Sequence, residues 1–595
     1  MNRLEALDQQ FSMRRFCNRF LPALLLFALA FPPSPAAAQA PDTATGSDGM
    51  VVAAEPFAAE VGLEILKQGG NAVDAAVAVG FALAVTYPQA GNLGGGGFML
   101  IRMADGRAVL VDYREAAPGA AHRDMYLDAE GNLIPQASTV GWRAAGVPGA
   151  VAGLTLAQEK FGSLPLKKIM APAIRLAEKG FPVSERLAQE LRDAAPLLSQ
   201  FPESRRIFLR NGRYYEPGET FRQKDLARTL KKIARRGARA FYQGSLAKRF
   251  ARAMKRHHGL ITRADLRRYQ ARVRQPLLGH FRGYEILGAP PPSSGGVAVL
   301  EMLNILDPLL PPDAEPLAPQ TIHLMTETMR RAFADRARFL GDSDFASVPV
   351  RGLLDPGYAR ALRTSIDPAR ASVSKQLSLP DPPGYEARSG NRAVLAPRHE
   401  SADTTHFSVV DGTGNAVATS ITINSFFGNG VTLPGLGFLL NNEMDDFTSK
   451  PGAPNALFGL VQSQANKIEP GKRPLSSMSP TIVIRNGQAI LALGSPGGPR
   501  IINAVLLVLL NRLAFGRPLA EAVALPRYHH QWLPDTLFLE KNLFSQEQLD
   551  ALAARGHALR ERESIGAVNA IERDPATGRL TGVSDARRRG VARGF

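Results

Sequence analysis

Cysteine is almost absent from this chain of 595 residues, because Cys17 is the only one. Beyond that position the chain therefore offers no disulfide, no thiolate nucleophile and no Cys-based metal site. Long hydrophobic runs are also missing: none approaches the roughly 20 apolar residues that a transmembrane helix needs. The hydrophobic content of 45% over this length is instead typical of one large globular protein with a substantial core.

Residues 1–40 have the order of regions typical of a cleavable secretory signal. A basic segment at residues 14–19 comes first, an apolar run at 21–31 follows, and small residues extend to residue 40. We therefore expect export to a bacterial periplasm or to the extracellular space, and no stable membrane span. A retained signal-anchor is the alternative, and translation from Met13 would give a shorter signal.

The formal net charge of +17 raises the question of a nucleic-acid partner. Basic residues recur at helical spacing between residues 231 and 256, and Ile233 and Phe250 are among the apolar residues available for a buried side. A solvated helical face accounts for this pattern, because no base-reading or stacking motif accompanies it. We expect no nucleic-acid function, and adhesion to anionic surfaces only as a secondary property. The basic residues are Lys231, Lys232, Arg235, Arg236, Arg239, Lys248, Arg249, Arg252, Lys255 and Arg256.

Residues 403–424 predict a β-hairpin. The Gly-Thr-Gly turn at 412–414 separates two segments with alternating apolar residues, as expected for half-buried strands. In this antiparallel register Thr404 faces Thr422, and Asn424 lies two residues farther along on the same face. A threonine pair in a sheet is usually a simple cross-strand contact.

Periodicity and turn signals predict several further elements. The segment 150–280 looks mainly helical and charged, and 379–399 is polar and Pro-rich, like a flexible tail. The other expected elements are a buried helix at 71–86, a helix at 319–340, a hairpin with strands at 98–103 and 108–112, and a hairpin with strands at 482–484 and 489–493.

Several long motifs resemble the γ-glutamyltransferase family, in the same order and over nearly everything after residue 45. Four of them are very specific: 404–411 (Thr-Thr-His-Phe-Ser-Val-Val-Asp), 440–447 (Leu-Asn-Asn-Glu-Met-Asp-Asp-Phe), 472–481 (Lys-Arg-Pro-Leu-Ser-Ser-Met-Ser-Pro-Thr) and 494–498 (Gly-Ser-Pro-Gly-Gly). The resemblance continues through 91–98, 112–115, 290–296 and 529–535.

The resemblance implies the α+β fold of N-terminal nucleophile hydrolases, an αββα sandwich with two stacked antiparallel sheets between helical layers. In that fold a precursor cleaves itself directly before its nucleophile. Here the cut would fall between Asp403 and Thr404, giving a large subunit of residues 41–403 and a small subunit of 404–595 that stay together as a heterodimer. A free α-amine on Thr404 would then serve as the base that a threonine hydroxyl needs.

The family pattern also implies roles for the remaining site residues. Thr422 would hold the new α-amine, and the backbone N–H groups of Gly497 and Gly498 would form the oxyanion hole. The substrate α-carboxylate would bind Arg114, Ser476 and Ser477, and its α-ammonium would bind Asn424, Glu443 and Asp446. Without the resemblance, Arg114 reads as an ordinary ion pair with Glu115, Asp446 as a helix or turn cap, and the glycine pair as a tight turn.

Other motifs carry weaker signals. The loop 451–471 has the length and the Pro, Gly and Asn content of a lid, with Phe458 as a weaker candidate for an aromatic gate. The glycine run at 91–97 lacks the strand-turn-helix context of a dinucleotide site, so we expect no cofactor. His529 and His530 read as structural, His406 is not expected to act as the base, and we expect no metal.

The sequence thus predicts a self-processing γ-glutamyltransferase and glutathione hydrolase that acts on small γ-glutamyl compounds. The γ-glutamyl group would pass through a Thr404 ester to water, an amino acid or a peptide. Two alternatives stay open: a glutaryl or cephalosporin acylase of the same fold, whose substrate lacks the α-ammonium, and an unprocessed protein that only binds γ-glutamyl compounds.

Overall fold

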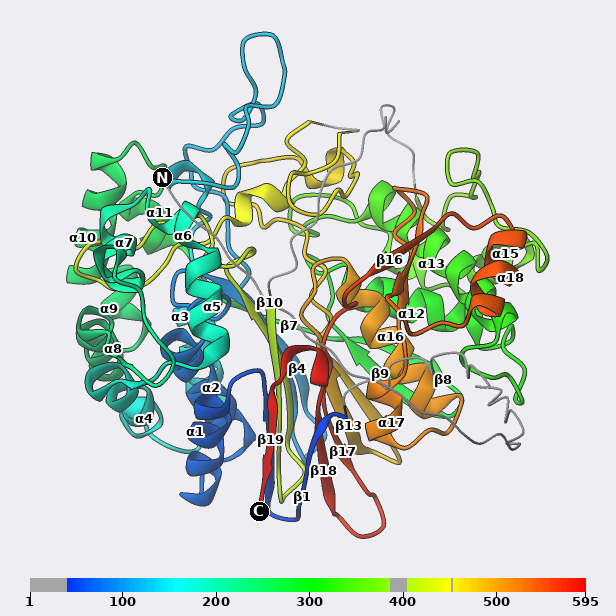
Figure 1. Ribbon diagram of the computed structural model, residues 1–595, viewed down its shortest axis with the longest axis horizontal. Coiled ribbons are helices and arrows are strands. Elements are labelled where there is room, and N and C mark those ends of the chain that lie inside the picture. The colour runs from blue at the N-terminus through cyan, green and yellow to red at the C-terminus, as the bar shows by residue number, and fades with distance from the viewer. Residues whose placement is uncertain (1–39, 386–403, 451–452) are drawn as a thin grey trace, which may run out of the picture.

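Two antiparallel sheets of seven strands each form the centre of the molecule (Figure 1). This computed structural model describes residues 40–385, 404–450 and 453–595. The first sheet contains, in spatial order, β19 (Val591–Gly594), β2 (Gly49–Ala53), β10 (Thr404–Asp411), β11 (Ala416–Thr422), β3 (Gly96–Arg102), β4 (Ala108–Asp112) and β7 (Arg272–Arg274). The second contains β1 (Asp42–Gly46), β18 (Leu580–Ser584), β17 (Asn569–Arg573), β13 (Gln488–Gly494), β12 (Thr481–Arg485), β9 (Tyr284–Gly288) and β8 (Leu277–Phe281).

Helices cover the outer face of each sheet, so the layers follow the order helix, sheet, sheet, helix (Figure 1). Beside the first sheet lie α1 (Pro56–Lys67), α2 (Ala72–Thr86), α3 (Ala150–Phe161), α4 (Leu166–Lys179), α5 (Glu185–Asp193), α8 (Lys224–Arg236), α9 (Ala238–Tyr242) and α10 (Ser245–Arg256). Beside the second lie α12 (Gly295–Leu306), α13 (Pro319–Phe339), α16 (Arg500–Leu513) and α17 (Leu519–Ala524). The expected αββα sandwich is confirmed.

Shorter elements complete the described chain. The helices are α6 (Ala195–Leu198), α7 (Pro202–Phe208), α11 (Arg263–Arg268), α14 (Val350–Leu353), α15 (Pro356–Thr364) and α18 (Gln546–Ala554). The strands are β5 (Phe181–Pro182), β6 (Thr220–Phe221), β14 (Tyr528–His529), β15 (Leu537–Glu540) and β16 (Leu559–Arg562), and there are 3₁₀ turns at Trp142–Ala144, Arg210–Gly212, Glu443–Asp446, Gln464–Asn466 and Ala586–Arg588. No described helix has both the length and the apolar character that crossing a bilayer requires.

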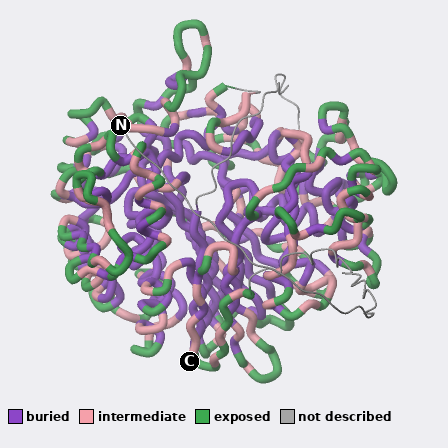
Figure 2. The backbone as a smooth tube through the Cα atoms, in the orientation of Figure 1, coloured by how far each residue is buried: buried purple, intermediate pink, exposed green. Residues whose placement is uncertain are grey.

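Strand β10 has apolar side chains on both of its faces, as a buried central strand requires. Phe407 and Val409 point into the core shared with α2, whereas Val410 points into the core between the two sheets. Successive side chains of a strand alternate between its faces, so this pattern fits a strand buried on both sides. Figure 2 shows the same burial throughout the central sheets.

The predicted helix at 71–86 is α2, which is buried on every side. It begins after Asn71, whose side chain accepts hydrogen bonds from the N–H groups of Val73 and Asp74 at 3.0 Å each. Asp74 bonds back to the Asn71 N–H, completing a capping box. Its small residues allow close approach, and α2 packs directly on β10 and β11.

The predicted hairpin register is confirmed, with Thr404 opposite Thr422. The helix expected at 319–340 is α13, and the two other predicted hairpins are β3–β4 and β12–β13. Segment 150–280 is mainly helical, with short strands β5 to β8 added. The expected tail at 379–399 is described only up to residue 385, and there Tyr385 packs on Phe339, so this part is not a free tail.

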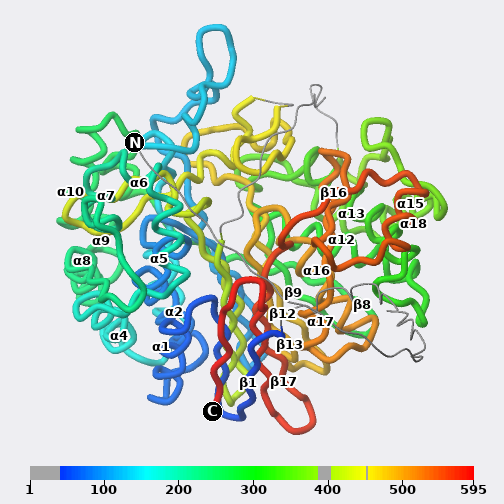
Figure 3. The backbone as a smooth tube through the Cα atoms, in the orientation of Figure 1, coloured from blue at the N-terminus to red at the C-terminus, as the bar shows by residue number. Residues whose placement is uncertain are grey.

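Each sheet contains strands from both sides of residue 403 (Figure 3). In the first sheet β10 and β11 lie between β2 and β3, and in the second β12 lies beside β9. The segments before and after this position therefore share both sheets and both cores. The expected signal at 1–40 lies outside the described residues except for residue 40, and so does the Asp403 side of the expected cut.

Candidate active site

Thr404 opens β10 and faces Thr422, the last residue of β11. Both side chains are buried, and their Oγ1 atoms lie 3.5 Å apart. The N–H of Asn424 donates to Thr422 Oγ1 at 2.8 Å, which holds that hydroxyl beside Thr404. Arg588 Nη1 donates to the backbone oxygen of Thr404 at 3.1 Å and fixes the start of the strand from the other side.

His406 plays no part in this pair. Its ring lies 2.9 Å from Ser420 Oγ and 3.2 Å from Ser408 Oγ, between the two sheets. Burial lowers the pKa of His406 to about 3, so the ring is neutral near pH 7. The expectation that His406 does not act as the base agrees with this position.

Arg114, just beyond the end of β4, forms the centre of a buried ion-pair network. Its guanidinium contacts the carboxylates of Glu443 and Asp446, which come from the 3₁₀ turn Glu443–Asp446. Arg114 Nε also donates to the backbone oxygen of Pro474 at 3.1 Å. Glu115, the alternative partner, lies 3.6 Å from Arg114 Nη1. The carboxylate of Asp446 thus binds Arg114 and does not cap a helix.

Burial changes the charge state of the acids around Arg114. It raises the pKa of Glu115 to about 8, against the lowering effect of Arg114. Neither carboxyl oxygen of Glu115 has a hydrogen-bond partner among the described residues, which favours the protonated form near neutral pH. Burial also raises the pKa of Asp446, and Arg114 opposes this rise.

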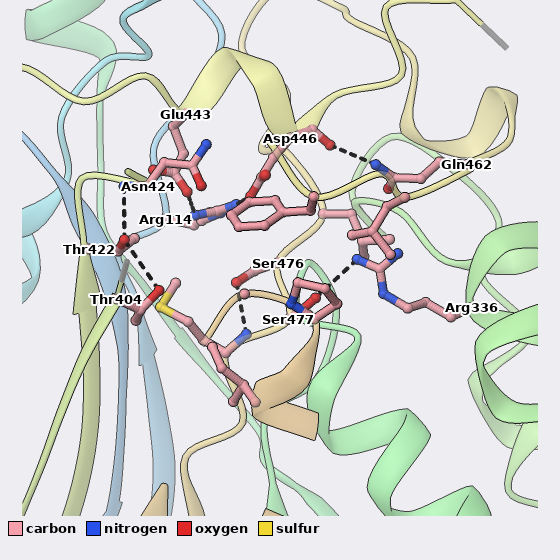
Figure 4. A pocket seen from close by; sticks show the side chains of 17 residues that line it. Arg114, Arg336, Thr404, Thr422, Asn424, Glu443, Asp446, Gln462, Ser476 and Ser477 are labelled. Atoms are coloured by element: carbon pink, nitrogen blue, oxygen red, sulfur yellow. Dashed lines mark hydrogen bonds and ion pairs between the residues drawn. The ribbon is translucent and has the colours of Figure 1, made fainter. Parts of the chain in front are cut away.

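Ser476 and Ser477 lie in the extended segment before β12, opposite the acidic turn (Figure 4). The Met478 N–H donates to Ser476 Oγ at 3.1 Å. Gly497 and Gly498 lie between β13 and α16, with φ of 138° and 57°. Glycine adopts such angles readily, and a Cβ on Gly498 would lie only 2.6 Å from the ring of Phe458.

The turn at Gly497–Gly498 lies at the N-terminus of α16, a position that favours anions. The Arg500 N–H donates to Gly497 O, and the Ile501 N–H donates to Gly498 O, so the turn continues directly into α16. Backbone N–H groups at a helix N-terminus carry partial positive charge and bind anions. The geometry therefore suits donors that face a developing oxyanion.

The predicted site residues surround one pocket (Figure 4). Its free volume is about 20 Å³, room for little more than one water molecule. Gly497 is the predicted site residue that does not line this pocket, although it adjoins Gly498. The lining residues are Arg114, Arg336, Thr404, Thr422, Asn424, Glu443, Asp446, Phe458, Leu460, Gln462, Leu475, Ser476, Ser477, Met478, Gly498, Pro499 and Ile501.

Arg336 and Gln462 line the pocket without having been expected from the sequence. Gln462 Nε2 donates to the backbone oxygen of Asp446 at 3.1 Å and supports the acidic turn. Arg336 lies on α13, where burial lowers the pKa of its guanidinium to about 10. An arginine at a core-facing position of a helix is the sequence signal for such a residue.

Phe458, the weaker gate candidate, is buried against Gly498 at the pocket. The loop that carries it is tied to the acidic turn, because the Leu457 N–H donates to Asp445 Oδ2 at 3.0 Å. His529 and His530 have structural partners, as expected: His529 Nδ1 lies 2.7 Å from Asn503 Nδ2, and His530 Nε2 lies 3.2 Å from Asp535 Oδ1.

One described cluster, His323, Glu327 and His557, has side chains of the kinds that bind metals. Except for His557 Nδ1, its nitrogen and oxygen atoms already have partners among the described residues. His323 Nδ1 lies 2.8 Å from His557 Nε2, and Glu327 forms ion pairs with Arg330 and Arg331. Two guanidinium groups beside the only carboxylate disfavour a cation, so this cluster does not support a metal site.

The fold and the threonine at the start of β10 define an N-terminal nucleophile hydrolase. The sequence matches the gamma-glutamyltranspeptidase family over residues 58–595. The chain belongs to this family.

Individual relatives agree with this assignment. The chain is 46% identical over 540 residues to the glutathione hydrolase proenzyme of Escherichia coli K12, covering 91% of this chain and 90% of that protein. The crystal structure of cephalosporin acylase from Bacillus halodurans superposes with a TM-score of 0.82 at 27% identity, covering 95% of this chain and 99% of that one. The gamma-glutamyltranspeptidase of Helicobacter pylori has a TM-score of 0.53 at 42% identity, covering 57% of this chain and 96% of that one.

Proposed function

We propose that this chain is a self-processing γ-glutamyltransferase and glutathione hydrolase whose nucleophile is Thr404. The observation that carries the proposal is the Thr404–Thr422 pair at a pocket lined by two arginines and two acids. A γ-glutamyl group carries an α-carboxylate and an α-ammonium, and each needs a partner of opposite charge when it leaves water.

Processing would occur between Asp403 and Thr404. The Thr404 Oγ1 attacks the carbonyl carbon of residue 403, the C–N bond breaks, and the resulting ester is hydrolysed to a carboxylate and a free α-amine. Because strands from both fragments pair with each other in both sheets, the fragments 41–403 and 404–595 would remain one heterodimer after the cut. Separating them would require breaking central strand pairs in each sheet.

In turnover, the α-amine of Thr404 accepts the proton of its own hydroxyl while Oγ1 bonds to the γ-carbonyl carbon of the substrate. The Gly497 and Gly498 N–H groups stabilise the oxyanion. The C–N bond then breaks, and the leaving amine takes the proton. Water, or the amine of an amino acid or peptide, attacks the Thr404 ester and restores the hydroxyl. Thr422 holds the α-amine in position.

The ion-pair network around Arg114 favours a glutamyl over a glutaryl group. A zwitterionic group inserts by giving its α-carboxylate to Arg114 and the serines, and its α-ammonium to Glu443, Asp446 and Asn424, so that no buried charge loses its partner. A glutaryl group brings only the carboxylate, and an acid that it displaces from Arg114 then has no cation in contact, only the more distant charge of Arg336. A buried charge without a partner costs several kcal/mol, on the order of a hundredfold or more in binding.

We further propose that the loop 453–471 acts as a lid. A free volume of about 20 Å³ is too small for a γ-glutamyl group, and a shift of Phe458, the lid residue that lies against Gly498, would admit the substrate. We propose that residues 1–40 direct export to the periplasm or the medium. Fractionation of expressing cells, with N-terminal sequencing of the product, tests this localisation.

Intact mass and N-terminal sequencing of the purified protein, combined with release from a γ-glutamyl anilide and from a glutaryl anilide, test the function. We expect two fragments, a new Thr404 terminus and release from the γ-glutamyl compound only. Preference for the glutaryl compound would make the protein an acylase. An uncut chain without release from either compound would leave a binding protein.

A further inference from the structure

Arg336 is a buried cation with no ion pair among the described residues. It is 2% exposed and reaches from α13 to the pocket wall opposite Arg114 (Figure 4). Its Nε donates to Ser294 Oγ at 3.0 Å and its Nη2 donates to Ser477 Oγ at 3.2 Å, whereas its Nη1 has no hydrogen-bond partner in the described part of the chain. A guanidinium that is buried with no acid in contact and one open N–H donor is costly, and only the more distant charge of Asp446 offsets that cost.

The contacts of Arg336 decide which way the neighbouring hydroxyls point. A guanidinium has no acceptor, so Ser477 Oγ must accept the hydrogen bond, and its own hydrogen stays available. Ser476 Oγ likewise accepts from the Met478 N–H. No described residue accepts a hydrogen bond from either hydroxyl. Two O–H donors are therefore left for an anion.

Arg336 also holds the backbone of this wall. Ser294, which accepts from Arg336 Nε, donates through its hydroxyl to the backbone oxygen of Ser476 at 2.7 Å. The N–H of Ser294 donates to the same oxygen at 2.7 Å. One side chain thus contacts Ser477 directly and Ser476 through a single intervening hydroxyl.

We propose that Arg336 is the positioning residue for the α-carboxylate of the substrate, because it orients the Ser477 hydroxyl, holds the Ser476 backbone through Ser294, and adds a second positive charge to the pocket. This rests on the proposed γ-glutamyl function. Arg114 and Arg336 then stand on the carboxylate side of the pocket, and Glu443 and Asp446 stand on the ammonium side.

The test compares two anilides that differ in the α-carboxylate. A γ-glutamyl anilide carries both α groups, and a 4-aminobutanoyl anilide keeps the amine but lacks the carboxylate. For Arg336→Met we expect KM for the γ-glutamyl anilide to rise about 10- to 100-fold, as for lost hydrogen bonds to a charged group, with kcat changed only a few-fold. The kcat/KM for 4-aminobutanoyl anilide should stay within about threefold of the unmodified enzyme. This substrate has no α-carboxylate, so it cannot lose the binding contact that Arg336→Met removes.

Two variants separate positioning from a structural effect. Arg331→Met also removes a buried arginine of α13, one that binds Glu327 and Ser365 away from the pocket. This variant should lower turnover of both anilides in parallel, or of neither. Arg336→Lys keeps the positive charge but loses the planar guanidinium with its several N–H donors. Its KM for the γ-glutamyl anilide should lie between the values for Arg336→Met and the unmodified enzyme.

A double-mutant cycle with Ser477→Ala completes the test. For the γ-glutamyl anilide, kcat/KM of the double variant Arg336→Met with Ser477→Ala should fall much less than the product of the two single losses predicts. If Arg336→Met does not fold, Ser477→Ala and Arg336→Lys still report on the same carboxylate selectivity. Parallel loss on both anilides, or the same selectivity change in Arg331→Met, would overturn the positioning role while leaving the enzyme a γ-glutamyltransferase. Failure of the unmodified protein to cleave the γ-glutamyl anilide would instead overturn the proposed function, and this role with it.

Discussion

The pocket beside Thr404 and the basic face formed by the exposed cations of α8 to α10 use charge in opposite ways. In the pocket, Arg114 is buried and contacts two acids. On the basic face, Arg235, Arg236 and Arg239 line an open hollow of about 720 Å³, and no acidic side chain lies within ion-pair distance of them among the described residues. The chain has no acid at all between Asp225 and Asp265.

The hollow on the basic face is larger than the pocket beside Thr404, but it is less suited to selective binding of one ligand. The pocket is small, with a free volume of about 20 Å³, but its charges are desolvated and fixed by neighbours, so each interaction is strong. Exposed cations on a helical face keep their hydration and are screened by salt. The net charge of +17 therefore says little about the chemistry of this protein. If function depends on the buried charges and hydroxyls, substitutions there should impair turnover more than substitutions on the basic face.

Removal of the Thr404 hydroxyl should have the largest effect. Thr404→Ala should abolish both chain cleavage and turnover, with a loss of at least about 10⁴-fold, because no other group can form the ester. Intact mass and γ-glutamyl anilide release measure the two effects. Thr405→Ala is the matched control, since the Thr405 hydroxyl is buried one residue away with no hydrogen-bond partner among the residues that the structure describes, and this variant should cleave and turn over normally. Cleaved Thr404→Ala protein would contradict the assignment of the nucleophile.

Arg114→Lys should have the next largest effect. Lysine keeps the charge but cannot bind a carboxylate with two parallel hydrogen bonds, so KM should rise about 10- to 100-fold while chain cleavage remains intact. Steady-state kinetics with the γ-glutamyl anilide and a gel of the fragments measure this. Arg274→Lys alters another arginine that binds two acids, Asp112 and Asp344, outside the pocket, and it should leave KM within about threefold. Equal changes in the two variants would mean that Arg114 is only structural.

The sequence predicted the threonine pair because strand pairing and alternation fix which residues face each other. Seven predicted site residues that line the pocket lie in the motifs that resemble a known family, and the hairpin register added Thr422 and Asn424. The sequence did not predict Arg336, because nothing local distinguishes it from Arg330 or Arg331, two other buried arginines of α13. Only the crossing of α13 with the serine segment brings Arg336 into the site.

The ion-pair network was predicted only in part. The sequence assigned Arg114 to an anion and Glu443 and Asp446 to a cation, but not the contacts among the three. Those contacts depend on where the 3₁₀ turn at Glu443–Asp446 packs on the end of β4, which is a long-range feature. The small free volume likewise depends on the ring of Phe458, which occupies space that a sequence pattern does not define.

Glu115→Gln should have a moderate effect that depends on pH. The pKa of Glu115 rises from 4.5 to about 8 in the fold, so between these values the folded protein keeps a proton that the unfolded chain releases. The stability contributed by this proton is present below pH 4.5 and is lost as pH rises through about 8, by up to about 1.4 kcal/mol per pH unit.

Glutamine resembles the protonated acid and does not titrate. Thermal unfolding of the purified protein from pH 5 to pH 8 should therefore show Glu115→Gln gaining in Tm over the unmodified protein as pH rises. Glu130→Gln, a change at an exposed acid, should show a constant difference. A constant difference for Glu115→Gln as well would mean that the buried carboxyl is ionised throughout this range.

Neutralising the basic face should have the smallest effect. In the triple variant Arg235→Gln, Arg236→Gln and Arg239→Gln, the loss of Arg235 and Arg236 from the last turn of α8 costs some helix-dipole energy, but like-charge repulsion also falls. The two effects oppose each other, so stability should change by no more than about 0.5 kcal/mol. The kcat and KM for the γ-glutamyl anilide should stay unchanged, whereas retention on a cation exchanger should fall. A drop in kcat/KM beyond about threefold at moderate salt would show that the open hollow contributes to turnover, and the contrast between buried and exposed charge would then fail.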